Sequence, residues 1–68
     1  MSTFKIEITS VPDRNKLVAE IWLDDSLIAE INQEKGEFEI ELYSVQNKVF
    51  KFDEFLAALE AGKKKLRG

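Results

Sequence analysis

Apolar and polar residues alternate along several stretches of this 68-residue chain, and that period of two constrains its fold more than any other feature. In the clearest stretch, 37–43, Phe38, Ile40 and Leu42 alternate with glutamates. Successive side chains of a strand point to opposite faces of a sheet, so this pattern indicates a strand buried on one face. The sequence therefore predicts an antiparallel sheet with one apolar face and one face turned to solvent.

Turn-forming residues divide the alternating stretches into strands. Pro12, Asp24 and Gly36 stand where the alternation breaks, and these residue types favour turns. Four strands are predicted, with a short fifth as an open alternative, at residues 3–9, 16–23, 27–33, 37–43 and, for the fifth, 48–52. Neighbouring strands are expected to pair in chain order as a meander.

A helix is predicted at 53–66. Asp53 suits an N-cap, apolar residues recur at helical spacing from Phe55 onward, and the basic run 63–67 suits the C-terminal end of the helix dipole. The chain 1–68 is then a single α+β domain, a four- to five-stranded antiparallel meander with one C-terminal α-helix packed on one face.

Composition narrows the possible functions. Thirteen acidic residues against ten basic ones give a net charge of −3, which disfavours nucleic acid and favours a basic protein as partner. The chain has no histidine or cysteine, so no catalytic, cofactor or metal site is predicted and the protein is not expected to be an enzyme. Without an apolar run of ~18 residues or a signal segment, a cytoplasmic location with no membrane contact is expected.

Matching the apolar faces of neighbouring strands predicts the register of the sheet. A three-residue turn, Asp24–Ser26, and a four-residue turn ending in Gly36 allow this match. The expected apolar pairs are Phe4 with Ile21, Ile6 with Ala19, Leu23 with Leu27, Ile21 with Ala29, Ala19 with Ile31, Ala29 with Ile40, and Leu27 with Leu42. The helix is expected to cover all of these side chains.

The same register places carboxylates abreast on the opposite face. Glu20, Glu30 and Glu39 fall side by side there, and Lys5 is the one cation expected opposite them. Like charges at ~5 Å destabilise a sheet, so reversing Glu30 and Glu39 to lysine is expected to preserve or slightly stabilise the fold. An acidic row around apolar anchors is typical of a protein-binding surface. The candidate partner-binding residues are Glu20, Trp22, Ile28, Glu30, Glu37, Glu39, Glu41 and Tyr43. An ordinary solvated face and a homodimer contact through Trp22 are the alternatives.

The run that begins at Leu17–Trp22 and ends at Glu37–Tyr43 resembles the small acidic immunity proteins encoded beside bacterial toxins, as in polymorphic-toxin and contact-dependent inhibition systems. The resemblance is one of size, charge and layout, and implies an inhibitor that presents carboxylates to a basic nuclease toxin. Glu20, Glu30, Glu39 and Glu41 are expected to steer the toxin, and Trp22, Ile28 and Tyr43 to anchor it. Alternatives are a nucleic-acid mimic that inhibits a DNA-binding protein, and a small homodimeric assembly protein.

Overall fold

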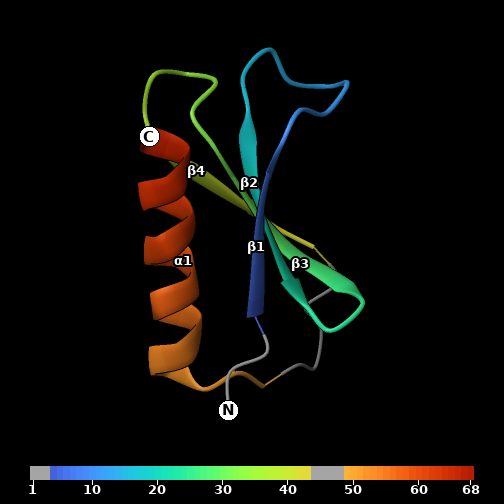
Figure 1. Cartoon of the computed structure of the whole chain (residues 1–68), viewed down its shortest axis with the longest axis vertical. Helices are drawn as coiled ribbons and strands as arrows, with labels where there is room; N and C mark the ends of the chain where they lie inside the picture. The colour runs from blue at the N-terminus through green and yellow to red at the C-terminus, as the bar shows by residue number, and fades with distance from the viewer. Residues whose placement is uncertain (1–3, 44–48) are drawn as a thin grey trace.

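The computed structural model describes residues 4–43 and 49–68, and it confirms the predicted α+β fold. Four antiparallel strands form one open sheet in the order β1-β2-β3-β4, and a C-terminal helix packs against it (Figure 1). The elements are β1 (Phe4–Thr9), β2 (Val18–Leu23), β3 (Ser26–Asn32), β4 (Glu39–Leu42) and α1 (Phe52–Arg67). Among the described residues, no helix combines the length and apolarity needed to cross a bilayer.

The segment proposed as a fifth strand does not form a strand in the part that the structure describes. Residues 49–51 are irregular and Phe52 already belongs to α1, while residue 48 lies outside the described residues. Phe50 does point inward, with its ring centroid 5.6 Å from that of Phe4 and 5.1 Å from that of Phe55. Phe52, which a strand at 48–52 would turn to the same face as Phe50, is 77% exposed.

α1 begins one residue earlier than predicted, and Asp53 is not its cap. The N-cap is Lys51, whose side chain makes no capping hydrogen bond, and the backbone N–H of Phe55 donates to the Lys51 carbonyl at 3.0 Å. Asp53 and Glu54 lie instead in the first turn, where their negative charge still complements the helix dipole.

The core lies between α1 and the first three strands. Its buried members Ala19, Ile21 and Ile31 meet the helix around Gly62, where an added Cβ would come within 3.0 Å of Ile31 Cδ1 and 3.5 Å of Ala19 Cβ. Gly62 therefore allows the helix to approach the sheet closely. This close packing offsets the cost of glycine in a helix, which is ~1 kcal/mol relative to alanine.

The turn between β2 and β3 is one residue shorter than predicted, and a β-bulge in β3 compensates for the difference. Asp24 and Asp25 form a two-residue turn, with Asp24 in the left-handed region at φ 55°. Leu23 pairs with Ser26, and the register then shifts by one residue so that Ile21 still pairs with Ala29. The extra residue is Ile28, and it absorbs the mismatch that a two-residue turn would otherwise create between the two faces.

The outer strands pair two residues away from the predicted register. Ile6 lies opposite Ile21 rather than Ala19, and Ile40 lies opposite Ile31 rather than Ala29. An even shift keeps every side chain on its predicted face, because side chains alternate with a period of two. It changes which residues are neighbours across strands, and this determines the composition of the acidic row.

Candidate binding surface

Four glutamates lie abreast across the whole sheet. Glu7 is paired with Glu20, Glu20 with Glu30, and Glu30 with Glu41, one residue from each strand. They occupy the face away from α1, because they alternate with residues such as Ile21 and Ile31 that meet the helix. The predicted row is therefore wrong in one member, since Glu39 pairs with Asn32 and Glu41 takes its place.

Each carboxylate of this acidic row has a partner that relieves the like-charge contact. Lys5 Nζ lies 3.0 Å from Glu7 Oε2, and Trp22 donates its indole N–H to Glu20 Oε1 at 3.1 Å. Arg14 serves the other two, with Nη2 at 2.8 Å from the carboxylates of both Glu30 and Glu41, and Nε donating to Glu30 at 3.0 Å.

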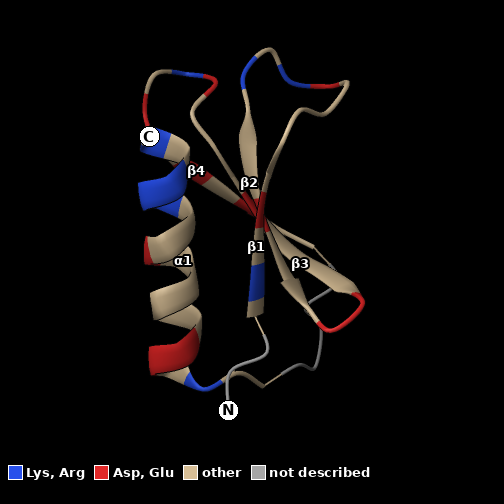
Figure 2. Ribbon diagram, viewed as in Figure 1, with Lys and Arg blue, Asp and Glu red and all other residues tan. Residues whose placement is uncertain are grey.

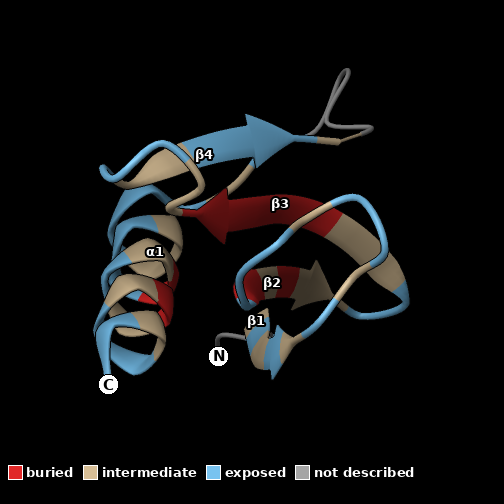
Figure 3. Ribbon diagram, turned by 90° about the horizontal axis from the view of Figure 1, so that it is seen from above, coloured by how far each residue is buried: buried red, intermediate tan, exposed pale blue. Residues whose placement is uncertain are grey.

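Arg14 belongs to the β1–β2 loop (residues 10–17), which folds over one end of the acidic face (Figure 3). The loop and α1 lie on opposite sides of the sheet (Figure 1). Val18, Glu30 and Asn32 on this face are therefore buried, with relative exposures of 0%, 5% and 3%. The expectation that the whole row is open to water is wrong for Glu30, and reversing Glu30 to lysine would place a buried cation against Arg14.

Glu34 in the β3–β4 loop holds the β1–β2 loop in place. Its carboxylate accepts hydrogen bonds from the backbone N–H groups of Asn15 at 3.0 Å and Lys16 at 2.8 Å. These two bonds lower the pKa of Glu34, because they favour the charged form. The Glu34 N–H donates in turn to Asn32 Oδ1 at 3.2 Å, so the anchor is tied to the end of β3.

The pKa values of two further groups near the acidic row, Arg14 and Tyr43, are raised. The hydrogen bond to Glu30 raises the pKa of Arg14, which keeps the guanidinium charged. Burial, and then the charges of Glu30 and Glu41, raise the pKa of Tyr43. The phenol is therefore neutral over the physiological range and acts as a half-buried apolar and hydrogen-bonding group.

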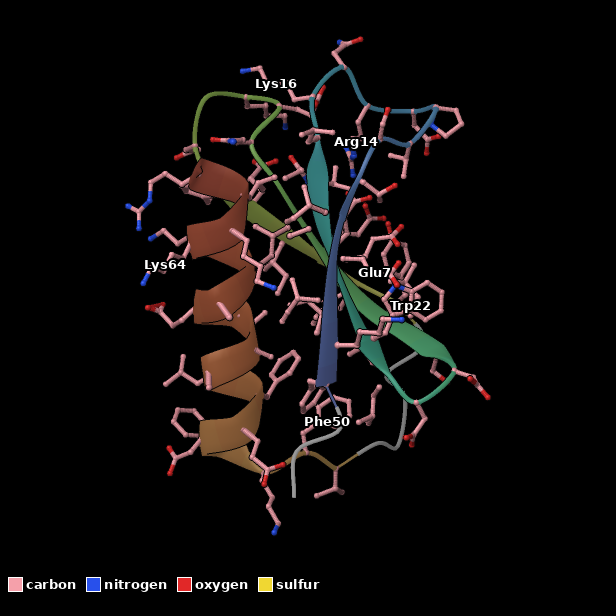
Figure 4. All side chains as sticks on the ribbon, in the orientation of Figure 1. Glu7, Arg14, Lys16, Trp22, Phe50 and Lys64 are labelled. Carbon is pink, nitrogen blue, oxygen red and sulfur yellow. The ribbon has the colours of Figure 1, made fainter. Side chains whose placement is uncertain are left out.

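The opposite end of the face is open, and a depression of about 310 Å³ lies there. Its lining residues are Lys5, Glu7, Trp22, Asp24 and Asp25. Glu7 and Trp22 project from the side of the sheet away from α1 (Figure 4), and the turn that carries both aspartates lies at the lower end of β2 and β3 (Figure 2). Three carboxylates and one ammonium therefore surround a half-buried indole ring.

The structure brings some of the predicted site residues together and separates others. Glu20, Glu30 and Glu41 share the row, and Trp22 touches Glu20. The rest are elsewhere or differently exposed: Ile28 is fully buried in the core, Glu37 lies exposed in the β3–β4 loop, Glu39 pairs with Asn32 and lies 4.0 Å from Lys35 Nζ, and Tyr43 follows β4.

Sequence reasoning missed Glu7, Arg14 and Glu34. Glu7 lies on the same face as Glu20, and only the two-residue error in the predicted register of β1 left it out of the predicted row. Arg14 and Glu34 stand in loops, where no periodic pattern predicts which strand a side chain will reach. The one available signal was that Arg14 is the single arginine that precedes α1 in the chain.

Comparison of the chain with protein-family models, with curated proteins and with solved structures found no match.

Proposed function

We propose that this protein is a non-enzymatic binding module whose acidic face captures a basic protein partner. The observation that carries the proposal is the depression around Trp22, where Glu7, Asp24 and Asp25 surround an accessible aromatic ring at the end of the face that no loop covers. It gathers the two things that a lysine or arginine side chain binds, carboxylates and an aromatic surface.

The two ends of the acidic row are expected to have different roles. Glu30 is neutralised and buried by Arg14, so it supports the fold and does not meet a partner. Glu7 and Glu20 remain partly exposed beside Trp22, and their contacts with Lys5 and the indole hold them in place. A partner's cation would therefore approach at the β1–β2 edge, and Glu41 and Glu39 would add attraction at longer range.

The narrower form of the proposal is an intracellular immunity-type inhibitor of a basic nuclease toxin. A nuclease presents a cationic groove to its phosphate substrate, and an acidic surface would compete for that groove. A nucleic-acid mimic would use the same face, so the partner's identity distinguishes the two forms.

The direct test uses an oligo-arginine peptide as probe and the fluorescence of Trp22, the single tryptophan of the chain. The peptide is expected to shift the emission, and binding is expected to weaken as salt rises. The double variant Glu7→Gln/Asp25→Asn should bind about tenfold more weakly, since it removes two charge contacts of roughly 0.7 kcal/mol each.

The matched control is Asp53→Asn, which removes an exposed acid from the start of α1 on the other side of the sheet. It should bind the peptide within about twofold of the parent. A loss of about threefold in the control, half of the double variant's loss on the free-energy scale because it removes one charge and not two, would mean that only net charge matters. The Trp22 depression would then be rejected as the site.

The nuclease form is tested with the product of the adjacent gene, prepared as a catalytically inactive protein. Its association rate should fall steeply with ionic strength and should fall in Glu7→Gln/Asp25→Asn but not in Asp53→Asn. A neighbouring gene that encodes no basic protein would contradict the immunity form of the proposal, whereas peptide binding at the Trp22 depression would be unaffected.

A further inference from the structure

A second exposed surface lies on the helix side of the sheet, where α1 leaves β4 uncovered. α1 makes close backbone contacts with β1, β2 and β3 but none with β4. Ile40 and Leu42 face the helix side, because they pair with Ile31 and Ala29, yet they are 46% and 53% exposed. The expectation that the helix covers the entire apolar face is therefore wrong at β4, whose ribbon is mostly exposed beside the buried β3 (Figure 3).

This uncovered strand and α1 border a groove, which we call the β4–α1 groove. It has a volume of about 170 Å³ and is lined by Ile31, Phe38, Glu39, Ile40, Leu59, Glu60 and Lys63. Leu56, one turn before Leu59 and Glu60 on α1, is 44% exposed and extends the apolar character along the helix. Lys63 lies with its ammonium 5.3 Å from the Phe38 ring centroid, so the cation stays at the groove.

The core beneath the groove is thin, and this makes additional burial valuable. Three of the seven buried apolar residues among those described are alanines, and the largest fully buried side chains are Ile21, Ile28 and Val18. The chain has no cysteine to form a disulfide. A domain of about 60 residues is marginally stable, and association is one of the usual ways to gain the missing burial.

The charges of the groove select a second copy of the chain as its occupant. A two-fold interface places one patch against the same patch, so the patch must complement itself. The β4–α1 groove carries both signs, because Glu39 and Glu60 line it together with Lys63, and Lys35 Nζ lies 4.0 Å from Glu39. A two-fold arrangement can set Lys63 of each copy near Glu60 of the other. The acidic face, by contrast, would repel its own copy.

We infer that the protein forms a homodimer through the β4–α1 groove, with the exposed side chains of β4 buried against α1 of the second copy. This interface leaves the Trp22 depression open in both copies, and Glu39 is the one residue assigned to the acidic face that also borders the groove. It also differs from the Trp22-mediated dimer considered from sequence. The inference therefore stands or falls independently of the proposed function.

Sedimentation equilibrium on the full chain, from low micromolar to near-millimolar concentration, tests it. The mass is expected to rise toward that of two chains, and the melting temperature is expected to rise with protein concentration. Leu42→Glu should weaken the dimer at least tenfold, whereas Leu17→Glu, which changes an equally exposed leucine in the β1–β2 loop, should leave it unchanged.

A charge-reversal series separates self-association from loss of folding. Glu60→Lys and Lys63→Glu should each weaken the dimer several-fold, and the combined variant Glu60→Lys/Lys63→Glu should restore it, because each reversed pair meets its complement across the two-fold. A single-chain mass at every concentration would overturn the inference, and so would a dimer that Leu42→Glu and both single reversals leave intact. Binding of the oligo-arginine peptide should be the same in all of these variants.

Discussion

Identical residues in this chain have unlike roles, because their surroundings differ. Glu30 and Glu39 are both strand glutamates on the same face, but Glu30 is buried under Arg14 and Glu39 has a 41% exposed side chain. Periodicity assigns both to the same face and cannot separate them. Which of the two is needed for the fold depends on a loop residue 16 positions before Glu30.

Glu30→Gln is therefore expected to lower the free energy of unfolding by about 1–3 kcal/mol, since it removes the charge of a buried carboxylate that accepts from Arg14. Glu39→Gln should change it by less than about 0.5 kcal/mol, because its contact with Lys35 is long and exposed. Urea denaturation of the two variants measures the difference. Equal effects would show that the Arg14 contact adds nothing to stability.

At the scale of elements, the sequence predicts the four strands, the helix and, except for Ile28 at the bulge, their faces, because each of these follows from the spacing of apolar residues. It predicts pairing poorly, because an even shift of two residues keeps every side chain on the same face and so leaves no trace in the pattern. The bulge at Ile28 is not visible in the sequence either, because the alternation of β3 reads as regular through it. The bulge is needed only because the turn before β3 has two residues.

The candidate site was predictable only as far as it follows from the strands. Glu20, Trp22 and Glu41 could be assigned to one face from alternation alone. The loop that buries half of that face could not, because its position depends on Glu34 accepting two backbone hydrogen bonds from a segment 18 to 19 residues earlier. Contacts between two irregular segments have no periodic signature.

The β1–β2 loop should respond to acid through Glu34. Its pKa is lowered in the folded protein, so its contribution to stability is present at neutral pH and is lost as pH falls through that lowered value. The amide resonances of Asn15 and Lys16 should shift together in an NMR titration as Glu34 protonates, below the pH at which a free glutamate titrates.

Glu34→Gln is the matched variant for this titration. It keeps a hydrogen-bond acceptor but removes the charge, so the acid-induced shift of the Asn15 and Lys16 amides should disappear. A shift that persists in the variant would assign the transition to another carboxylate of the loop or of the acidic row.

At the scale of the whole molecule, the stability of the fold is limited by the amount of apolar surface that one helix can cover. α1 covers three strands, and the exposed side chains of β4 remain. Ile21 is one of the largest fully buried side chains of the core and lies against α1 at Gly62. Small domains of this size rarely have more than roughly 3–5 kcal/mol to lose.

Ile21→Ala is expected to cost about 2–5 kcal/mol and to leave the chain largely unfolded at low concentration, as judged by circular dichroism. Leu17→Ala, at a side chain that is 53% exposed, should cost less than about 0.5 kcal/mol. If the chain dimerises through the β4–α1 groove, raising the concentration should refold part of the Ile21→Ala population. A fully folded Ile21→Ala monomer would contradict the thin-core description.

The position of α1 in the chain has a consequence for biosynthesis. The ribosome makes all four strands before it makes the helix that covers them, although the ring of Phe4 in the first strand packs against Phe55 in that helix. Until α1 emerges, the nascent hairpins expose the apolar side of the sheet, including Ile6 and Ile21, to solvent or to a chaperone. Translation stalled between β4 and α1 should therefore yield a chain that chaperones hold and proteases degrade, whereas release of the helix should end both within a single folding step.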